Sequence, residues 1–343
     1  MKFDISGKNR FKIIGIIAFL LIICASAGAF AQNFESQIER KEQRDAKFFE
    51  LAEGVLDLTK IEYRSRIGDM QIPAYVFQPL EKRGINGHPA LIWVHGGVHG
   101  DLDPEHYWPF IKEAIDQGYV VIAPEYRGST GYGKDHYEAI DYGGYEVDDC
   151  VTAVDYMRSR MPHVDTDRVG MIGFSHGGFI TLHSLLRNPG VFKGGAAMVP
   201  VTNLVFRLSY KGPRYQRGFT SQKRIGGLPH ERKQTYIERS PFYQVEKLED
   251  PLIVHLAEND TDVNFEEAEM LAWKLMALKS DLAEVKIYKN PPGFPGASSG
   301  GHTFNRRVDV DNGYVRLDSW EQRDSWNRIW AFFDLHLKPY MGK

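Results

Sequence analysis

The chain has 343 residues, of which 43% are hydrophobic and 25% charged, and its formal net charge at pH 7 is −3. This ordinary globular composition can supply a large core, and the lack of any repeat of 20–50 residues in the sequence excludes solenoids and propellers. A net-acidic chain without a basic block matches nucleic-acid binding poorly, so we expect no nucleic-acid partner.

Residues 1–31 have the pattern of a secretory signal peptide. Basic residues precede an unbroken apolar run at 13–23, and small residues follow up to an A-x-A motif that ends at Ala31. The pattern predicts export, with cleavage after Ala31 and a periplasmic or secreted mature protein. An uncleaved membrane anchor is the alternative, although the run is short for a spanning helix. After cleavage we expect no stable membrane insertion.

The chain has two cysteines, and cleavage of the leader would remove Cys24. Cys150 would then have no intrachain disulfide partner. It lies in a segment with amphipathic helical spacing, which favours a buried structural thiol over a nucleophile.

After the leader, residues 32–58 are polar and charged with weak helical spacing, which predicts an exposed helix or a tether. Beyond them, apolar runs of strand length alternate with helical patterns. The predicted strands are 61–64, 72–78, 90–95, 119–123, 168–172, 194–198, 252–256 and 283–289, and the predicted helices are 109–117, 141–161, 175–187, 264–278 and 318–336. This alternation predicts an α/β fold with a mostly parallel, doubly wound sheet and helices on both faces.

No segment between the first strand and the last helix has the composition of a linker, so residues 59–343 are expected to form one domain. Residues 201–240 are polar, aromatic and basic, without a clean period. They are expected to leave the core as an excursion near the mouth of the active site.

The most informative motif directly follows the strand predicted at 168–172. Gly173, Ser175 and Gly177 form the G-x-S-x-G pattern of a nucleophile elbow, where a strand turns sharply into a helix. Glycines flank the serine because side chains there would obstruct the approach of strand and helix. A glycine-rich turn with an incidental serine is the plain alternative, so Ser175 is a candidate nucleophile that needs partners.

A serine hydroxyl needs a general base to activate it and a carboxylate to orient that base. In this architecture the partners follow in the order Ser, Asp or Glu, His, each beyond the end of a strand. The acidic loop after the strand at 252–256 offers Asp260 as the triad carboxylate, while Asp262 is expected to cap the next helix. The glycine-rich loop after the last strand leads to His302, the expected base.

Acyl transfer also needs N–H donors for the oxyanion that develops on the substrate. One donor is expected to be the backbone N–H of His176, the residue after the nucleophile. The second is expected from His95-Gly96-Gly97, after the strand at 90–95. We favour Gly97, with the neighbouring Val98 as the alternative.

A polar run around this glycine pair also has the chemistry of metal ligands. It contains six histidines and carboxylates at short spacing: His95, His99, Asp101, Asp103, Glu105 and His106. Such groups bind zinc or calcium in other proteins, but a loop beside an oxyanion site is equally polar without a metal. We expect neither a metal nor a cofactor.

Several blocks in one order resemble the catalytic domain of the prolyl oligopeptidase family of serine peptidases, over about Ile72 to His336. The blocks are His95-Gly96-Gly97, Tyr126-Arg127-Gly128-Ser129-Thr130-Gly131-Tyr132-Gly133, Gly173–Gly178, Ser240-Pro241, Asp260-Thr261-Asp262-Val263 and Gly301-His302. The second block is the most specific, because ordinary lipases and esterases lack it. The resemblance implies an α/β-hydrolase fold for residues 59–343 and cleavage of peptide bonds through an acyl-enzyme. It also implies that Asp260, the first residue of the family's Asp-x-x-Val pattern, is the triad carboxylate.

The chain departs from the family's pattern in two places. Val98 stands where members often have proline after His-Gly-Gly. Many members also carry a β-propeller before the catalytic domain, whereas only about 30 residues separate the predicted leader from the first strand here. We therefore expect no propeller, and the family's restriction to short peptides cannot be carried over to this chain.

The sequence thus predicts an exported serine-type peptidase that acts on a peptide or a small acyl substrate. A carboxylesterase acting on acyl esters, such as acylated carbohydrates, would use the same triad and remains the alternative. A non-catalytic binding module with a retained fold is a third hypothesis. Oligomeric state cannot be predicted from these residues.

Overall fold

The computed structural model of the protein describes residues 33–341. The predicted leader at 1–31 lies outside these residues, so export and cleavage after Ala31 stay predictions. Within the described range, no helix combines the length and the apolar character that crossing a membrane requires.

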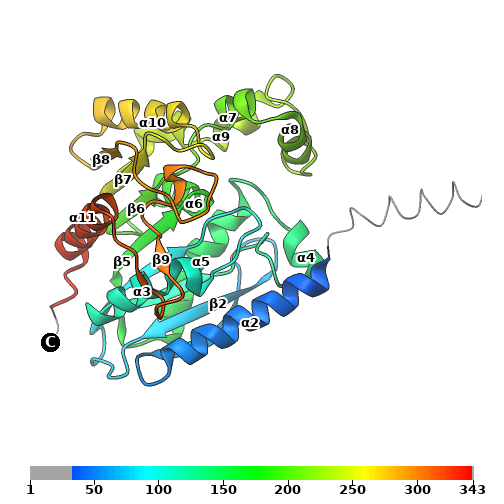
Figure 1. Ribbon diagram of the computed structural model, residues 1–343. Helices are drawn as coiled ribbons and strands as arrows, with labels where there is room; N and C mark the ends of the chain where they lie inside the picture. The colour runs from blue at the N-terminus through cyan, green and yellow to red at the C-terminus, as the bar shows by residue number, and fades with distance from the viewer. Residues whose placement is uncertain (1–32, 342–343) are drawn as a thin grey trace, which may run out of the picture.

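An eight-stranded sheet forms the centre of the molecule (Figure 1). Its strands lie in the order β1-β2-β4-β3-β5-β6-β7-β8; β1, β2 and β4 pair antiparallel, and all neighbours from β4 to β8 pair parallel. The strands are β1 (Asp57–Arg64), β2 (Gln71–Gln78), β3 (His88–Val94), β4 (Val120–Pro124), β5 (Val164–Phe174), β6 (Gly194–Met198), β7 (Leu252–Ala257) and β8 (Ala283–Tyr288). A separate two-stranded ribbon joins β9 (Val308–Asp309) to β10 (Val315–Arg316). The mostly parallel α/β sheet predicted from the sequence is confirmed.

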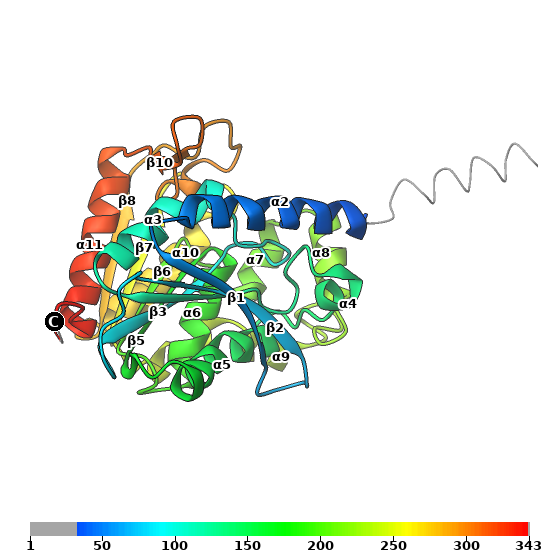
Figure 2. The ribbon, with the colours of Figure 1, turned by 90° about the horizontal axis from the view of Figure 1, so that it is seen from below.

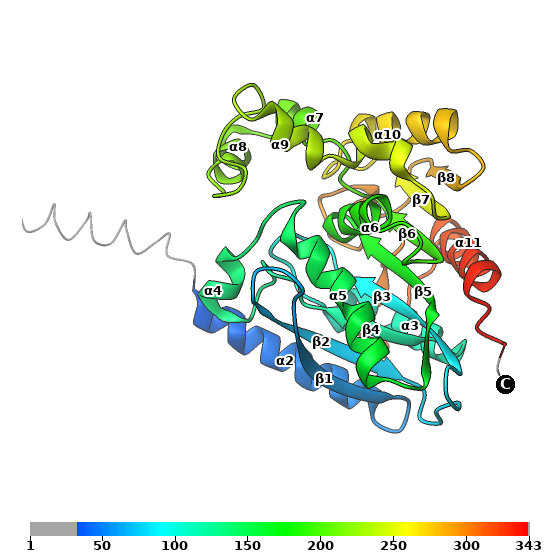
Figure 3. The same cartoon turned by 180° about the vertical axis from the view of Figure 1, so that it is seen from behind.

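Helices cover both faces of this sheet, as views from opposite sides show (Figures 1 and 3). The helices are α2 (Phe34–Ala52), α3 (Pro104–Asp116), α4 (Gly133–Glu138), α5 (Tyr145–Arg160), α6 (His176–Arg187), α7 (Leu204–Tyr210), α8 (Pro213–Thr220), α9 (Lys233–Glu238), η1 (Pro241–Lys247), α10 (Phe265–Leu278), η2 (Gly301–Thr303) and α11 (Trp320–Leu337). The two larger core clusters contain residues from helices: one includes Ile180 of α6 and Leu271 of α10, and another includes Phe110 of α3 and Trp326 of α11. Cys150 is buried in α5, as the sequence predicts.

Helix α3 begins five residues before its predicted start at 109. Asp103 caps it by accepting a hydrogen bond from the backbone N–H of His106, and Pro104 occupies the first turn. Proline suits that turn because the N–H it lacks would have no partner within the helix. Pro109 lies inside the helix and does not begin it, so the predicted start at 109 was wrong.

The N-terminal segment is a helix of 19 residues, α2, which runs along one side of the molecule (Figure 2). Asn33 caps its first turn by accepting a hydrogen bond from the N–H of Ser36. Phe48 is fully buried against Tyr75 and Phe77 of β2. Of the two expected alternatives the helix is the one that forms, but it is packed on the domain and is not merely exposed.

Residues 201–240 form the short helices α7, α8 and α9, which stand in a group beside α10 in Figure 1. Their buried residues include Arg207, Phe219 and Tyr236. Phe219 and Tyr236 belong to the same core cluster as Ile180 of α6, so the segment is part of the core, contrary to the expectation from its irregular sequence pattern.

Candidate active site

The nucleophile elbow lies between β5 and α6. Ser175 has a φ of 56° and a ψ of −115°, a conformation that costs a residue with a side chain about 1–3 kcal/mol. A Cβ on Gly173 would collide with the carbonyl of Gly177, and one on Gly177 would collide with the carbonyl of Val94. The backbone N–H of Ser175 donates to Met198 at 2.8 Å, which ties the turn to β6. The motif therefore forms the sharp turn that its glycines predict.

The structure brings Ser175, His302 and Asp260 together at the carboxyl end of the sheet. They follow β5, β8 and β7, three parallel strands whose ends meet at one edge. The distance from His302 Nε2 to Ser175 Oγ is 2.9 Å, and that from His302 Nδ1 to Asp260 Oδ2 is 2.7 Å. With the imidazole protonated at Nδ1, the serine hydroxyl donates to Nε2 and Nδ1–H donates to the carboxylate. This is the geometry that activation of a serine requires.

The other oxygen of Asp260 fixes the carboxylate in its loop. Its Oδ1 accepts hydrogen bonds from the backbone N–H groups of Asp262 at 2.9 Å and Val263 at 3.0 Å. An isolated antiparallel bridge between Asp260 and Gly300 joins this loop to the one that carries His302. The two loops therefore position the side chains of His302 and Asp260 relative to each other.

Asp262 does not cap α10, contrary to the sequence-based expectation. Asn264 stands at the cap position, and no side chain there bonds the helix. Asp262 points toward the triad, with Oδ2 at 3.6 Å from His302 Nε2 and Oδ1 at 2.9 Å from Lys211 Nζ. Burial acts to raise the pKa of Asp262, but the charges of His302, Arg207 and Lys211 outweigh it and lower that pKa. A second carboxylate thus lies beside the imidazole of His302.

The substitution Asp262→Asn should move the acidic limb of the kcat/KM pH profile to lower pH. The anionic carboxylate favours the protonated imidazole of His302, which cannot act as a base, so a neutral amide leaves the base active at lower pH. Because the Asp262 side chain is 43% exposed, solvent screens the charge, and we expect a shift of roughly 0.5 pH unit. Glu258→Gln, an exposed change in the same loop, is the matched control and should leave the profile unchanged. A shift to higher pH for Asp262→Asn would contradict this reading.

Both expected oxyanion donors are backbone groups in constrained segments. His176 is the first residue of α6, and Gly97 has a φ of 82°, which a glycine adopts without strain. The Tyr126 hydroxyl donates to the carbonyl of Gly97 at 2.6 Å, and the Gly96 N–H donates to the Tyr107 hydroxyl at 2.9 Å. Over residues 33–341, neither the N–H of Gly97 nor that of His176 donates a hydrogen bond to the protein.

Several supporting residues were not identified from the sequence. Tyr107 also accepts a hydrogen bond from Arg306 at 2.9 Å, so Arg306 fixes the hydroxyl that binds the N–H of Gly96. Tyr126 lies in a block that was recognised only as a family signature. No sequence signal connects Tyr107 to Arg306, since 199 residues separate them.

A cleft of about 710 Å³ lies beside the proposed oxyanion site. It is bounded on one side by Val98, the neighbour of Gly97, and by Tyr142, whose ring is 4.5 Å from the imidazole of His176. Helix α8 forms the other side with Tyr215 and Phe219. Residues of the 201–240 segment thus line one side of this cleft, and the aromatic rings of Tyr142, Tyr215 and Phe219 make up much of its wall.

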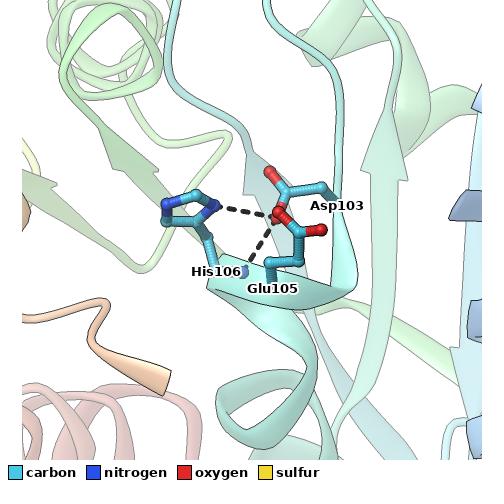
Figure 4. Close-up of side chains that lie close together, drawn as sticks. All are labelled: Asp103, Glu105 and His106. Atoms are coloured by element: carbon cyan, nitrogen blue, oxygen red, sulfur yellow. Dashed lines mark hydrogen bonds and ion pairs between the residues drawn. The ribbon is translucent and has the colours of Figure 1, made fainter. Parts of the chain in front are cut away.

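Of the six candidate metal ligands, the structure groups Asp103, Glu105 and His106 (Figure 4). Asp103 Oδ1 accepts hydrogen bonds from both the backbone N–H and Nδ1 of His106, each at 2.8 Å. These bonds form the cap of α3, which accounts for the proximity of the groups. His99 and Asp101 are engaged elsewhere: His99 stacks on Tyr137, and Asp101 pairs with Arg44.

The parallel sheet, the elbow and the loop order define this chain as an α/β-hydrolase with a serine–histidine–aspartate constellation. The family model described as the prolyl oligopeptidase family matches residues 110–292, which is more than half of the chain. The chain therefore belongs to the prolyl oligopeptidase family. The matched region contains Ser175 and Asp260, whereas Gly97 and His302 lie outside it.

Similar proteins of the family are considerably longer than this chain. A protein of Bacillus subtilis (strain 168) named uncharacterized peptidase YuxL is 29% identical over 280 residues, covering 81% of this chain and 39% of its own length. Dipeptidyl aminopeptidase BIII of Pseudoxanthomonas mexicana is 30% identical over 211 residues, covering 60% of this chain and 30% of its own. The chain thus spans less than half the length of these relatives.

The fold is also shared with solved structures. A Mycobacterium tuberculosis puromycin-hydrolyzing peptidase matches 82% of this chain and 39% of its own, with a TM-score of 0.62 and 22% identity. An acylaminoacyl peptidase in complex with Z-Gly-Gly-Phe-chloromethyl ketone matches 79% of this chain and 44% of its own, with a TM-score of 0.62 and 20% identity. At these identities the likeness establishes the α/β-hydrolase fold.

Proposed function

We propose that this chain is an exported serine-type peptidase, in which Ser175 is the nucleophile, His302 the general base and Asp260 the residue that orients the base. The observation that carries the proposal is the pair of contacts at His302, 2.9 Å to the Ser175 hydroxyl and 2.7 Å to the Asp260 carboxylate. Membership of the prolyl oligopeptidase family supports peptides as substrates. The leader pattern that ends at Ala31 supports export.

In the acylation half, Ser175 Oγ forms a bond to the substrate carbonyl carbon as its proton passes to His302 Nε2. Asp260 stays ionised and stabilises the imidazolium, while the N–H groups of His176 and Gly97 bind the oxyanion. His302 then gives the proton to the departing amine as the C–N bond breaks, which leaves an acyl ester on Ser175. In the second half, His302 takes a proton from water, the hydroxide attacks the ester, and Ser175 recovers its proton.

Kinetics on matched substrates test the peptidase assignment. A series of peptide anilides and the corresponding short acyl esters would be compared by kcat/KM on the protein without its leader. We expect efficient cleavage of at least one anilide, with a strong dependence on peptide sequence. The reason is that contacts between a peptidase and the side chains of its substrate stabilise the transition state of peptide cleavage. Hydrolysis of the esters alone would reject the peptidase and leave a carboxylesterase.

A further inference from the structure

Helix α2 is attached to the domain by a buried lysine. The side chain of Lys41 is only 3% exposed, and its ammonium group donates to Glu125 Oε1 at 2.6 Å and to the carbonyl of Leu102 at 3.0 Å. It also lies 3.6 Å from Asp101 Oδ2. A Cβ on Gly131 would collide with the Lys41 side chain. Gly131 belongs to the family block at residues 126–133, so this block packs closely against Lys41. Burial of a charge is costly unless the charge is paired and hydrogen-bonded, and Glu125, Asp101 and the carbonyl of Leu102 supply these partners.

The partner of Lys41 is fully buried and directly follows β4. Glu125 Oε1 also accepts a hydrogen bond from the N–H of Leu102 at 3.1 Å, and Oε2 lies 3.3 Å from His95 Nε2. Burial acts to raise the pKa of Glu125, but the charges and hydrogen bonds of Lys41 and His95 together outweigh it and lower that pKa to about 2. Glu125 is therefore an anion at neutral pH, with Lys41 on one oxygen and His95 beside the other.

His95 begins the segment that leads to the proposed oxyanion donor. Its ring stacks on Tyr126 with the centroids 4.4 Å apart, and its Nε2 is 2.9 Å from the hydroxyl of Ser129. The Tyr126 hydroxyl in turn donates to the carbonyl of Gly97 at 2.6 Å. A continuous series of contacts thus runs from Lys41 through Glu125 to the peptide of Gly97.

We infer that Lys41 of α2 is a positioning residue for the oxyanion-binding loop, residues 95–103, and that α2 is thereby part of the catalytic apparatus. This inference rests on the proposed function. Lys41 pairs with Glu125, whose second oxygen lies beside His95 at the start of the loop. Lys41 also donates to the carbonyl of Leu102 near the end of the loop. Both ends of the loop therefore contact the same buried ion pair. Oxyanion stabilisation depends on donors that are fixed before the charge develops, so displacement of Gly97 should affect the transition state more than the bound substrate.

The test compares Lys41→Met and Glu125→Gln with the parent protein on its best substrate. Because the positioned N–H of Gly97 stabilises the transition state rather than the bound substrate, each variant should lower kcat by about 10–100-fold and change KM by less than about threefold. A peptide aldehyde of the same sequence, which forms a tetrahedral adduct, should lose affinity in proportion to kcat/KM. Lys47→Met is the control, because Lys47 lies on the same helix and pairs with Glu50, away from the loop; its kcat should not change.

Circular dichroism and thermal unfolding identify variants that have not folded. If Lys41→Met does not fold, the isosteric Glu125→Gln carries the test, because it removes the charge without removing side-chain volume. A folded variant of either residue with kcat within twofold of the parent would overturn the inference. So would a loss confined to KM. A parent protein that cleaves no substrate would instead refute the proposed function, so the two failures can be distinguished.

Discussion

Replacing Ser175 with alanine is expected to lower kcat by about 10⁴–10⁶-fold, because the variant has no atom that can form the acyl bond. The backbone should keep its conformation, since alanine at this position has the same φ requirement and loses only one hydroxyl. A fluorophosphonate probe should label the parent protein at Ser175 and leave the variant unlabelled. The measurements are kcat/KM on the best substrate, mass spectrometry of the labelled peptide, and thermal unfolding.

Ser184→Ala is the matched control for this experiment. Ser184 is also buried, lies in α6 about two turns from the elbow's end of the helix, and has a hydroxyl without a hydrogen-bond partner within the described residues. Its loss should leave both activity and labelling intact. Retention of more than a small fraction of activity by Ser175→Ala, or labelling of another residue, would show that the elbow serine is not the nucleophile.

The second large effect is expected at Asp260. Asp260→Asn should lower kcat by about 10³–10⁴-fold, because the amide can neither hold His302 in the tautomer protonated at Nδ1 nor stabilise the imidazolium. Asp262→Asn removes the same charge from the same loop and also lies beside His302, yet it has no hydrogen bond to the imidazole. We expect it to lower kcat by less than about tenfold.

The comparison of these two variants distinguishes two effects of a carboxylate on His302: orientation of the imidazole through a hydrogen bond, and the negative charge nearby. Full steady-state profiles from pH 5 to pH 9 would show whether the loss in Asp260→Asn persists at every pH. Similar losses in the two variants would indicate that the negative charge alone matters. A small effect of Asp260→Asn with a large effect of Asp262→Asn would reassign the triad carboxylate.

Much of the fold could be predicted because its signals are local. Apolar runs of strand length and amphipathic helices between them predict a parallel sheet, and the structure confirms it. The boundary of α3 was missed because two prolines, at 104 and 109, both fit a helix start, and only the cap at Asp103 distinguishes them. The docking of α2 was missed because its apolar contacts depend mainly on one residue, Phe48, among many charges.

The sequence by itself determined the elbow, the order of Ser175, Asp260 and His302, and the family. These features depend on residues that are close together in the chain, such as the glycines of a turn and the residues of a short motif. Only the tertiary structure decided that Asp262 lies against His302 rather than on its helix, that Lys41 reaches Glu125, and that α8 borders the cleft. These contacts join residues far apart in the chain. The partners of a buried charge are set by which segments pack together in the folded protein, and no local sequence pattern predicts them.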